Sequence, residues 1–223
     1  MHIDSSTLSV QVTCQSGFYT HIMEQCELSK EMATHLERFM RTGEGEAVES
    51  LRQLESAGMG LRERNMEALR LAPVSPADRE ENHRACLTIE TIQNQLRAIA
   101  EEMEVLEMRA DWHMLEMVVR LRHALELLSS GFHKLLATPV AAIDEAEAIF
   151  AWRRAVEKSY RSSMVHLLQA DAHTPAPDLQ TPSGMRQVFH LFKRQEIYQH
   201  FRAIGLEIGK AGRYLHGIAL QFT

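Results

Sequence analysis

The sequence predicts an all-α protein of six long helices, arranged as two tandem antiparallel three-helix bundles. Apolar residues recur at helical spacing along most of the 223 residues, and no stretch of any length alternates as a strand does. Glycine and proline are few, at 11 and 6 residues, which also favours helix. The connections within each run of three helices are short, as they are between antiparallel neighbours in a bundle.

The chain is expected to begin with an N-terminal arm over residues 1–16. Leu8, Val10 and Val12 alternate there as in a strand, and a disordered end is the alternative, since chain termini are commonly poorly ordered. The first helix is predicted over about 17–41 from a core-facing stripe of apolar residues, namely Phe18, Ile22, Leu28, Met32, Leu36 and Phe39.

Two more helices complete the first predicted bundle, which spans 17–109. The second helix covers about 46–71 and stops at the two prolines of the segment APVSP, which cannot continue a helix. Ser75 is the expected N-cap of the third helix, and Pro76 stands at its first position.

The second predicted bundle spans 110–223. No glycine or proline separates the third helix from the fourth, so we predict a join near 109–112 with Asp111 as the N-cap. A fifth helix follows over about 140–170, and residues 171–184 form a proline-rich surface loop.

The sixth helix is predicted from about Met185 to the end of the chain. Gly205, Gly209 and Gly212 recur on nearly one of its faces, and each costs about 1 kcal/mol of helix propensity relative to alanine. We interpret this face as a packing seam, with ordinary tolerated glycines as the alternative. The apolar stripe of this helix comprises Phe189, Phe192, Ile197, Phe201, Ile204, Ile208, Tyr214, Leu215 and Ile218.

Composition excludes several classes of function. A net charge of -6 lacks the dominant basic field that nucleic-acid binding selects. Three cysteines without CxxC spacing suit a reducing compartment, and no run of about 20 apolar residues could span a bilayer. The start of the chain has no signal-peptide pattern, so a cytoplasmic location is expected. No GxSxG, HExxH or glycine-rich phosphate loop occurs, and we expect no enzymatic activity.

Several local signatures, in the order of the helices, resemble the PhoU-like phosphate transport regulators, specifically the accessory proteins of low-affinity phosphate (Pit) permeases. The segment Ser75–Glu80 resembles the Thr-Pro-x-Asp-Arg start of the family's third helix, and Tyr160-Arg161 fits its fifth. The closing segment 193–220 matches the family's last helix at Glu196, Ile197, Tyr198, Gly217 and Ile218.

The resemblance implies metal clusters on paired acidic motifs in helices two, three, five and six, but this chain departs from them. Only three of the eight corresponding positions keep an acid. We hypothesise that an ion-pair network of Arg153, Glu157 and Arg202 replaces the metal in the second bundle. The eight positions pair Glu55 with Met59, Glu90 with Asn94, Arg153 with Glu157, and Arg202 with Leu206.

The sequence is compatible with three functions. The first is a regulatory or accessory protein that needs no cofactor and docks on a phosphate permease or sensor kinase, peripheral to the inner membrane. The second is a protein that binds a metal weakly through Glu55, Glu90 and Asn94. The third is a structural module that forms a homo-oligomer through the face of Gly205, Gly209 and Gly212. Phosphate binding by Arg153 and Arg202 is a further alternative, because arginine matches phosphate oxygens.

Overall fold

Six α-helices make up the described part of the chain, which contains no strand. The computed structural model describes residues 5–71, 75–169 and 180–223, and the side chains in these ranges except those of 5–18, 76–78 and 169. The all-α fold class is therefore confirmed. The helices are α1 (Ser5–Thr42), α2 (Gly45–Leu71), α3 (Pro76–Val105), α4 (Trp112–Lys134), α5 (Pro139–Gln169) and α6 (Pro182–Leu220).

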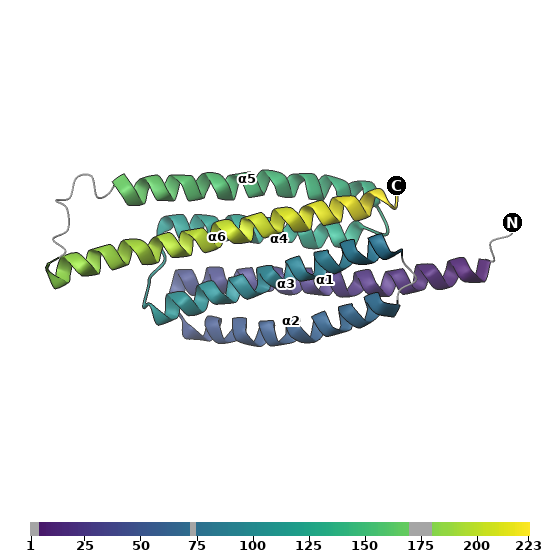
Figure 1. Ribbon diagram of the computed structural model, residues 1–223, viewed down its shortest axis with the longest axis horizontal. Coiled ribbons are helices and arrows are strands. Elements are labelled where there is room, and N and C mark those ends of the chain that lie inside the picture. The colour runs from purple at the N-terminus through teal and green to yellow at the C-terminus, as the bar shows by residue number, and fades with distance from the viewer. Residues whose placement is uncertain (1–4, 72–74, 170–179) are drawn as a thin grey trace.

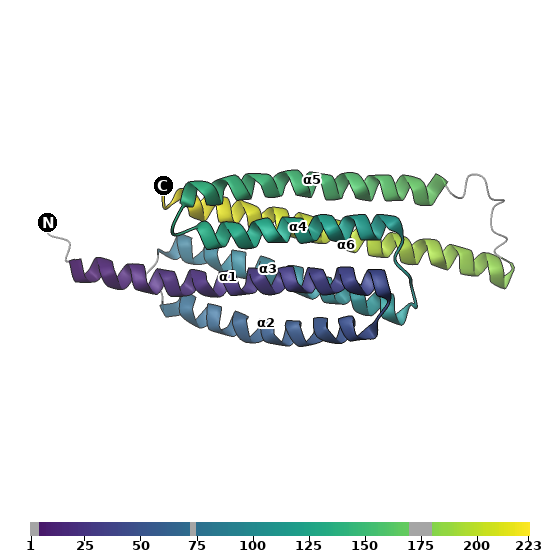
Figure 2. The same ribbon diagram turned by 180° about the vertical axis from the view of Figure 1, so that it is seen from behind.

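Each helix runs antiparallel to the next, and the six lie in four layers (Figures 1 and 2). One outer layer is α5, followed by α4 with α6, then α1 with α3, and α2 forms the other outer layer. We call α1–α3 the first set and α4–α6 the second set. They lie side by side because α1 packs against α4 and α3 packs against α6. Buried apolar residues of both sets form one continuous core.

Helix α1 begins at Ser5, so the predicted arm over residues 1–16 is wrong for residues 5–16. Residues 1–4 lie outside the described part of the chain. The alternation of Leu8 and Val10 was too short to fix a conformation. Continuation of an established helix adds one hydrogen bond per residue, whereas an isolated strand has no partner for its backbone.

The break between α3 and α4 falls where the sequence places it. Helix α3 ends at Val105, and the side chain of Asp111 accepts a hydrogen bond of 3.0 Å from the backbone N–H of Met114. Glu107 in this connection has a φ of 50°, a left-handed conformation that terminates the helix. The second set therefore begins with a capped helix rather than with a continuation of the first.

Helix α6 begins earlier than predicted and buries less of its stripe. It starts at Pro182 after the N-cap Thr181, so residues 182–184 of the predicted loop are helical, while 170–179 lie outside the described part. Phe201 and Ile208 are fully buried, as expected. Phe189 and Phe192 are 56% and 62% exposed, and their predicted place in the core is wrong. The cause is length, because α6 extends beyond the helices that could cover it (Figure 1).

The glycine face of α6 packs against α5 inside the molecule. A Cβ at Gly205 would stand 3.0 Å from Val156, and one at Gly212 would stand 3.0 Å from Ile149. A Cβ at Gly209 would stand 2.6 Å from the side chain of Arg153. This face is a packing seam between two helices of one chain, so self-association would require a different surface.

Candidate functional site

Two ion pairs cross between α2 and α3 at the positions where the family resemblance places metal ligands. Glu55 and Arg62 stand two turns apart on α2, and Glu90 and Arg97 stand two turns apart on α3. Because the helices are antiparallel, Glu55 faces Arg97 at 2.6 Å and Arg62 faces Glu90 at 2.7 Å. We call these four residues the α2–α3 charge ladder.

A third arginine extends the ladder towards the start of α2. Arg52 donates hydrogen bonds of 3.1 Å to Glu101 and 2.9 Å to Glu104 on α3. Each of these ion pairs joins residues that are far apart in sequence, so together they fix how α2 lies against α3. The members of the ladder are partly exposed, and pairs of this kind contribute about 0–1 kcal/mol each. Their main effect is therefore on alignment rather than on total stability.

The ladder fits a bound cation poorly. Hard cations need several oxygen ligands, whereas Glu55 and Glu90 each already face a guanidinium. Asn94 is exposed one turn after Glu90, and Met59 offers only a thioether on the opposite helix. Among the described side chains, no three of His, Cys, Asp and Glu come together as a metal site would require. The three weak candidates Glu55, Glu90 and Asn94 therefore lack the donor set of a metal centre.

The second set holds a similar arrangement between α5 and α6. Glu157 accepts a hydrogen bond of 2.8 Å from Nε of Arg202 and one of 3.1 Å from Nε of Arg161. The Arg202 guanidinium also lies 5.0 Å from the ring centroid of Tyr160, within cation–π range. The hydrogen bond from Arg202 is the main reason that the pKa of Glu157 falls below its ordinary value. This carboxylate is therefore ionised and neutralised by arginine.

Arg153 lies next to the ion pairs of Glu157 but takes no part in them. Its aliphatic stem covers Gly209, and it forms no ion pair with any described residue. The structure thus brings Glu157 and Arg202 together, as predicted, and replaces Arg153 with Arg161 as the second cation. The α5 surface here forms a shallow depression of about 300 Å³. Its lining is basic around one carboxylate and comprises Arg153, Arg154, Glu157, Lys158 and Arg161.

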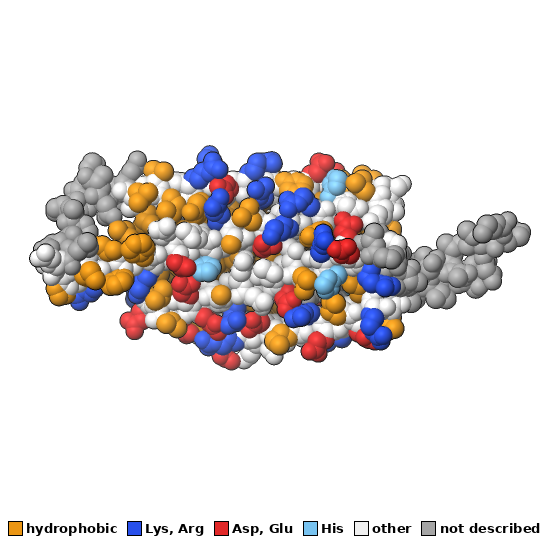
Figure 3. All heavy atoms as spheres, viewed as in Figure 1, with side chains coloured by type: hydrophobic (Ala, Val, Ile, Leu, Met, Phe, Trp, Pro, Cys, Tyr) orange, Lys and Arg blue, Asp and Glu red, His pale blue; other side chains and the backbone are white. Residues whose placement is uncertain are grey.

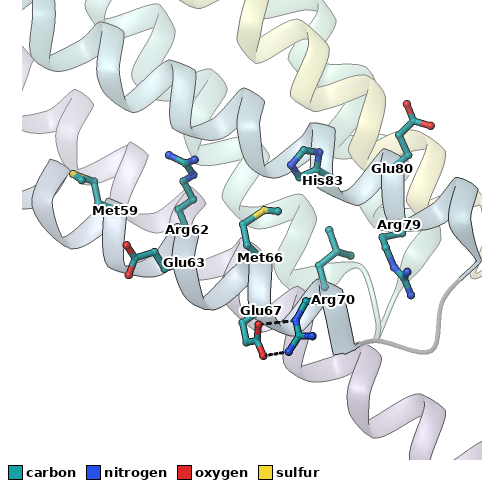
Figure 4. Close-up of a pocket in the computed structure, with 10 residues that line it drawn as sticks. Met59, Arg62, Glu63, Met66, Glu67, Arg70, Arg79, Glu80 and His83 are labelled. Atoms are coloured by element: carbon teal, nitrogen blue, oxygen red, sulfur yellow. Dashed lines mark hydrogen bonds and ion pairs between the residues drawn. The ribbon is translucent and has the colours of Figure 1, made fainter.

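A groove of about 810 Å³ lies between the C-terminal half of α2 and the start of α3 (Figure 4). Met66 lies between the two helices, and Met59 on α2 is 60% exposed. His83 faces α2 from α3, and Arg70 pairs with Glu67 on the outer side. Methionine is flexible and polarisable, so such a surface can adapt to an apolar helix from another protein. This groove is the candidate partner-binding site.

Sequence reasoning missed Arg62 and Arg97, which complete the ladder. A signal for them was present, because Glu55 with Arg62 and Glu90 with Arg97 repeat the same seven-residue spacing. On antiparallel neighbours, this repeat places opposite charges face to face. On each helix the acid comes before the base. When the two helices run antiparallel, the acid of each therefore faces the base of the other.

In its described part the chain is a six-helix all-α protein in which the partly exposed carboxylates of Glu55, Glu90 and Glu157 are paired with arginines. No family model matches the sequence, and no curated protein is similar to it in sequence. No described helix is both long enough and apolar enough to cross a membrane.

Comparison with solved structures shows that the fold is that of PhoU and PhoU-like proteins. A PhoU-like protein from Shewanella oneidensis superposes with a TM-score of 0.70 at 13% identity, over 92% of this chain and 99% of that one. PhoU from Pseudomonas aeruginosa gives 0.69 at 11% identity, over 95% and 99%. A PhoU-like phosphate regulatory protein from Shewanella oneidensis gives 0.63 at 10%, over 92% and 99%.

Proposed function

We propose that this protein is a non-enzymatic accessory protein of inorganic phosphate transport that acts by binding other proteins in the cytoplasm. The observation that carries the proposal is the PhoU fold along at least 92% of the chain, with nearly the whole of each solved relative covered. The local signatures from Ser75 to Ile218 support it independently. The described part of the chain also offers a broad groove.

The groove between α2 and α3 is the proposed docking site for a helix of a phosphate permease or its sensor. The exposed Met59 and the half-buried Met66 supply apolar contact, and charged groups surround them. Interfaces of this kind place apolar anchors at the centre and a polar rim outside. The α2–α3 charge ladder holds the two walls of the groove in register.

Metal is not required in this proposal. The arginines of the ladder take the place that a cation would have beside Glu55 and Glu90. Arg202 does the same for Glu157. These ion pairs neutralise the carboxylates without a bound cation, which supports a role that does not use a metal.

Affinity capture from membranes that contain a phosphate permease tests the proposal. We expect the permease to be retained by the wild-type protein and lost with Met59→Glu, because a carboxylate in the apolar centre of an interface must be desolvated. Leu136→Glu is the matched control, since Leu136 is also exposed and lies just past the end of α4. Equal retention of the permease by wild type and Met59→Glu would exclude the groove as the docking site. If the wild-type protein retains no permease, the accessory role is contradicted.

A further inference from the structure

Helices α5 and α6 extend past their neighbours at one end of the molecule. Both ribbon views show the last turns of α5 and the first turns of α6 reaching beyond the ends of α1–α4 (Figures 1 and 2). We call residues 158–169 of α5 and 180–195 of α6 the α5–α6 tip. The start of α4 lies against part of this pair, because the His113 ring is 5.1 Å from the His166 ring and Asp111 pairs with Arg194. The first turns of α6 extend past this contact (Figure 1).

The tip exposes large apolar side chains in a group. Figure 3 shows hydrophobic side chains gathered over this end of α5 and α6. On α6, Met185, Phe189 and Phe192 follow the spacing i, i+4, i+7 and therefore share one face. The exposed fractions are 51% for Val165, 68% for Leu168, 43% for Met185, 56% for Phe189 and 62% for Phe192. An exposed apolar group of this kind marks an interaction surface.

The charge of the tip is opposite to that of the whole protein. Residues 158–195 contain five Lys or Arg and two Asp, a net charge of +3, while the chain carries -6, so the remainder carries -9. Both acids belong to the linker between the helices, and the described residues of the tip contain none. Lys158 and Arg186 are exposed on the tip, whereas Arg161 pairs with Glu157 and Arg194 pairs with Asp111.

We propose that the α5–α6 tip docks on the surface of an anionic lipid bilayer. An amphipathic surface of this composition lies in the membrane interface, with its apolar side chains below the headgroups and its basic side chains among them. Phe189 and Phe192 are the insertion anchors, and Lys158 and Arg186 meet the negative headgroups. This binding does not depend on the phosphate-transport role, and it adds a second contact for a protein that acts at a membrane.

The positive charge of the α5–α6 tip favours an anionic lipid surface, rather than a second copy of the chain, as its binding partner. Two tips in contact would bring two regions of net charge +3 together, and like charges at a partly apolar contact oppose association. An anionic bilayer removes that repulsion and covers the apolar group at the same time. The basic depression around Arg154 on α5 continues the positive surface away from the tip.

Co-sedimentation of the full chain with lipid vesicles tests the proposal. The probes are phosphatidylcholine vesicles with and without phosphatidylglycerol. We expect binding to the anionic vesicles only, and a loss of about tenfold or more for the double variant Phe189→Ser, Phe192→Ser, because partition follows the apolar area inserted. Lys158→Glu with Arg186→Glu should also lower binding about tenfold, and added salt should weaken it.

Matched controls separate the tip from general surface effects. Leu206→Ser with Leu220→Ser removes two exposed leucines elsewhere on α6, and Arg64→Glu reverses an exposed charge on α2. Both controls should bind vesicles as the wild type does. All altered side chains are exposed or nearly so, and unchanged circular dichroism melting curves establish that each variant is folded.

Two results would overturn the proposal. One is wild-type protein that stays in the supernatant with anionic vesicles, or a Phe189→Ser, Phe192→Ser variant that binds as well as wild type. The other is a change of molar mass by light scattering, without lipid, on replacing Phe189 and Phe192, because the tip would then be an interface between copies of the chain. Neither result would affect capture of a permease through the α2–α3 groove.

Discussion

Glu157 is held between two guanidinium groups, and its neighbours decide its protonation. The hydrogen bond from Arg202 lowers its pKa from the ordinary value of 4.5, and the hydrogen bond from Arg161 acts in the same direction against partial burial. A carboxyl group with a lowered pKa in the folded state stabilises that state when it is ionised. This contribution is present above the unfolded pKa and is lost as the pH falls through the folded pKa.

We predict that Glu157→Gln lowers the free energy of unfolding by about 0.5–1 kcal/mol at neutral pH, the range expected for a partly exposed pair. The difference from wild type should begin to shrink as the pH falls towards the ordinary value of 4.5, and it should disappear only below the lowered pKa of the folded state, where the wild-type carboxyl is protonated. Urea unfolding followed by circular dichroism at several pH values measures it. Glu147→Gln, an exposed acid on the same helix, is the control and should have little effect. A pH-independent difference would contradict the ion-pair explanation.

At the scale of single helices, the apolar stripe that the sequence predicts is buried, except where a helix extends past its neighbours. The apolar stripe of α6 is buried from Ile197 to Ile218 and exposed at Phe189 and Phe192, although the periodicity is the same throughout. The seam of Gly205, Gly209 and Gly212 lies within the covered part. Small residues there let α5 approach α6 closely.

The seam gives a prediction about the pair α5–α6. Gly209→Leu should lower the free energy of unfolding by about 1–3 kcal/mol, because even a Cβ would stand 2.6 Å from the Arg153 side chain, which must shift from its place over α6 to make room for the leucine. The midpoint of urea unfolding is the measurement.

Gly60→Leu on α2 is the matched control for the seam. A Cβ there meets only the end of Arg64 at 3.6 Å. Leucine should be neutral or stabilise the helix by up to about 1 kcal/mol. Similar midpoints for the two leucine variants would contradict the close approach of α5 and α6.

At the scale of the whole molecule, the two sets share one continuous core, and charged contacts also join them. Arg122 of α4 donates a hydrogen bond of 2.9 Å to Glu37 of α1, and His200 of α6 lies 3.1 Å from Glu102 of α3. These contacts cross the boundary that the sequence predicts between residues 109 and 110. We therefore expect both sets to unfold together.

Leu51→Ala tests this cooperativity. Leu51 is fully buried on α2, which contacts only α1 and α3, so its loss acts on the first set and should cost about 2–5 kcal/mol. Both tryptophans, Trp112 and Trp152, belong to the second set. We predict that the urea midpoint from tryptophan fluorescence falls by as much as the midpoint from circular dichroism.

Leu71→Ala, at the exposed end of α2, is the control for cooperative unfolding and should leave both midpoints unchanged. A fluorescence midpoint that stays in place for Leu51→Ala would show that the second set unfolds independently. The predicted bundles 17–109 and 110–223 would then be separate domains.

The sequence by itself determined the six helices, most of their ends and the family resemblance. Helical periodicity, prolines and the Asp111 cap act over a few residues, so they can be recognised without knowledge of the fold. Only the tertiary structure decided which charges meet, because Arg62 pairs with Glu90 across 28 residues and Arg202 pairs with Glu157 across 45. Those pairings, and the exposure of Phe189, depend on how far each helix extends along its neighbours, which no local pattern encodes.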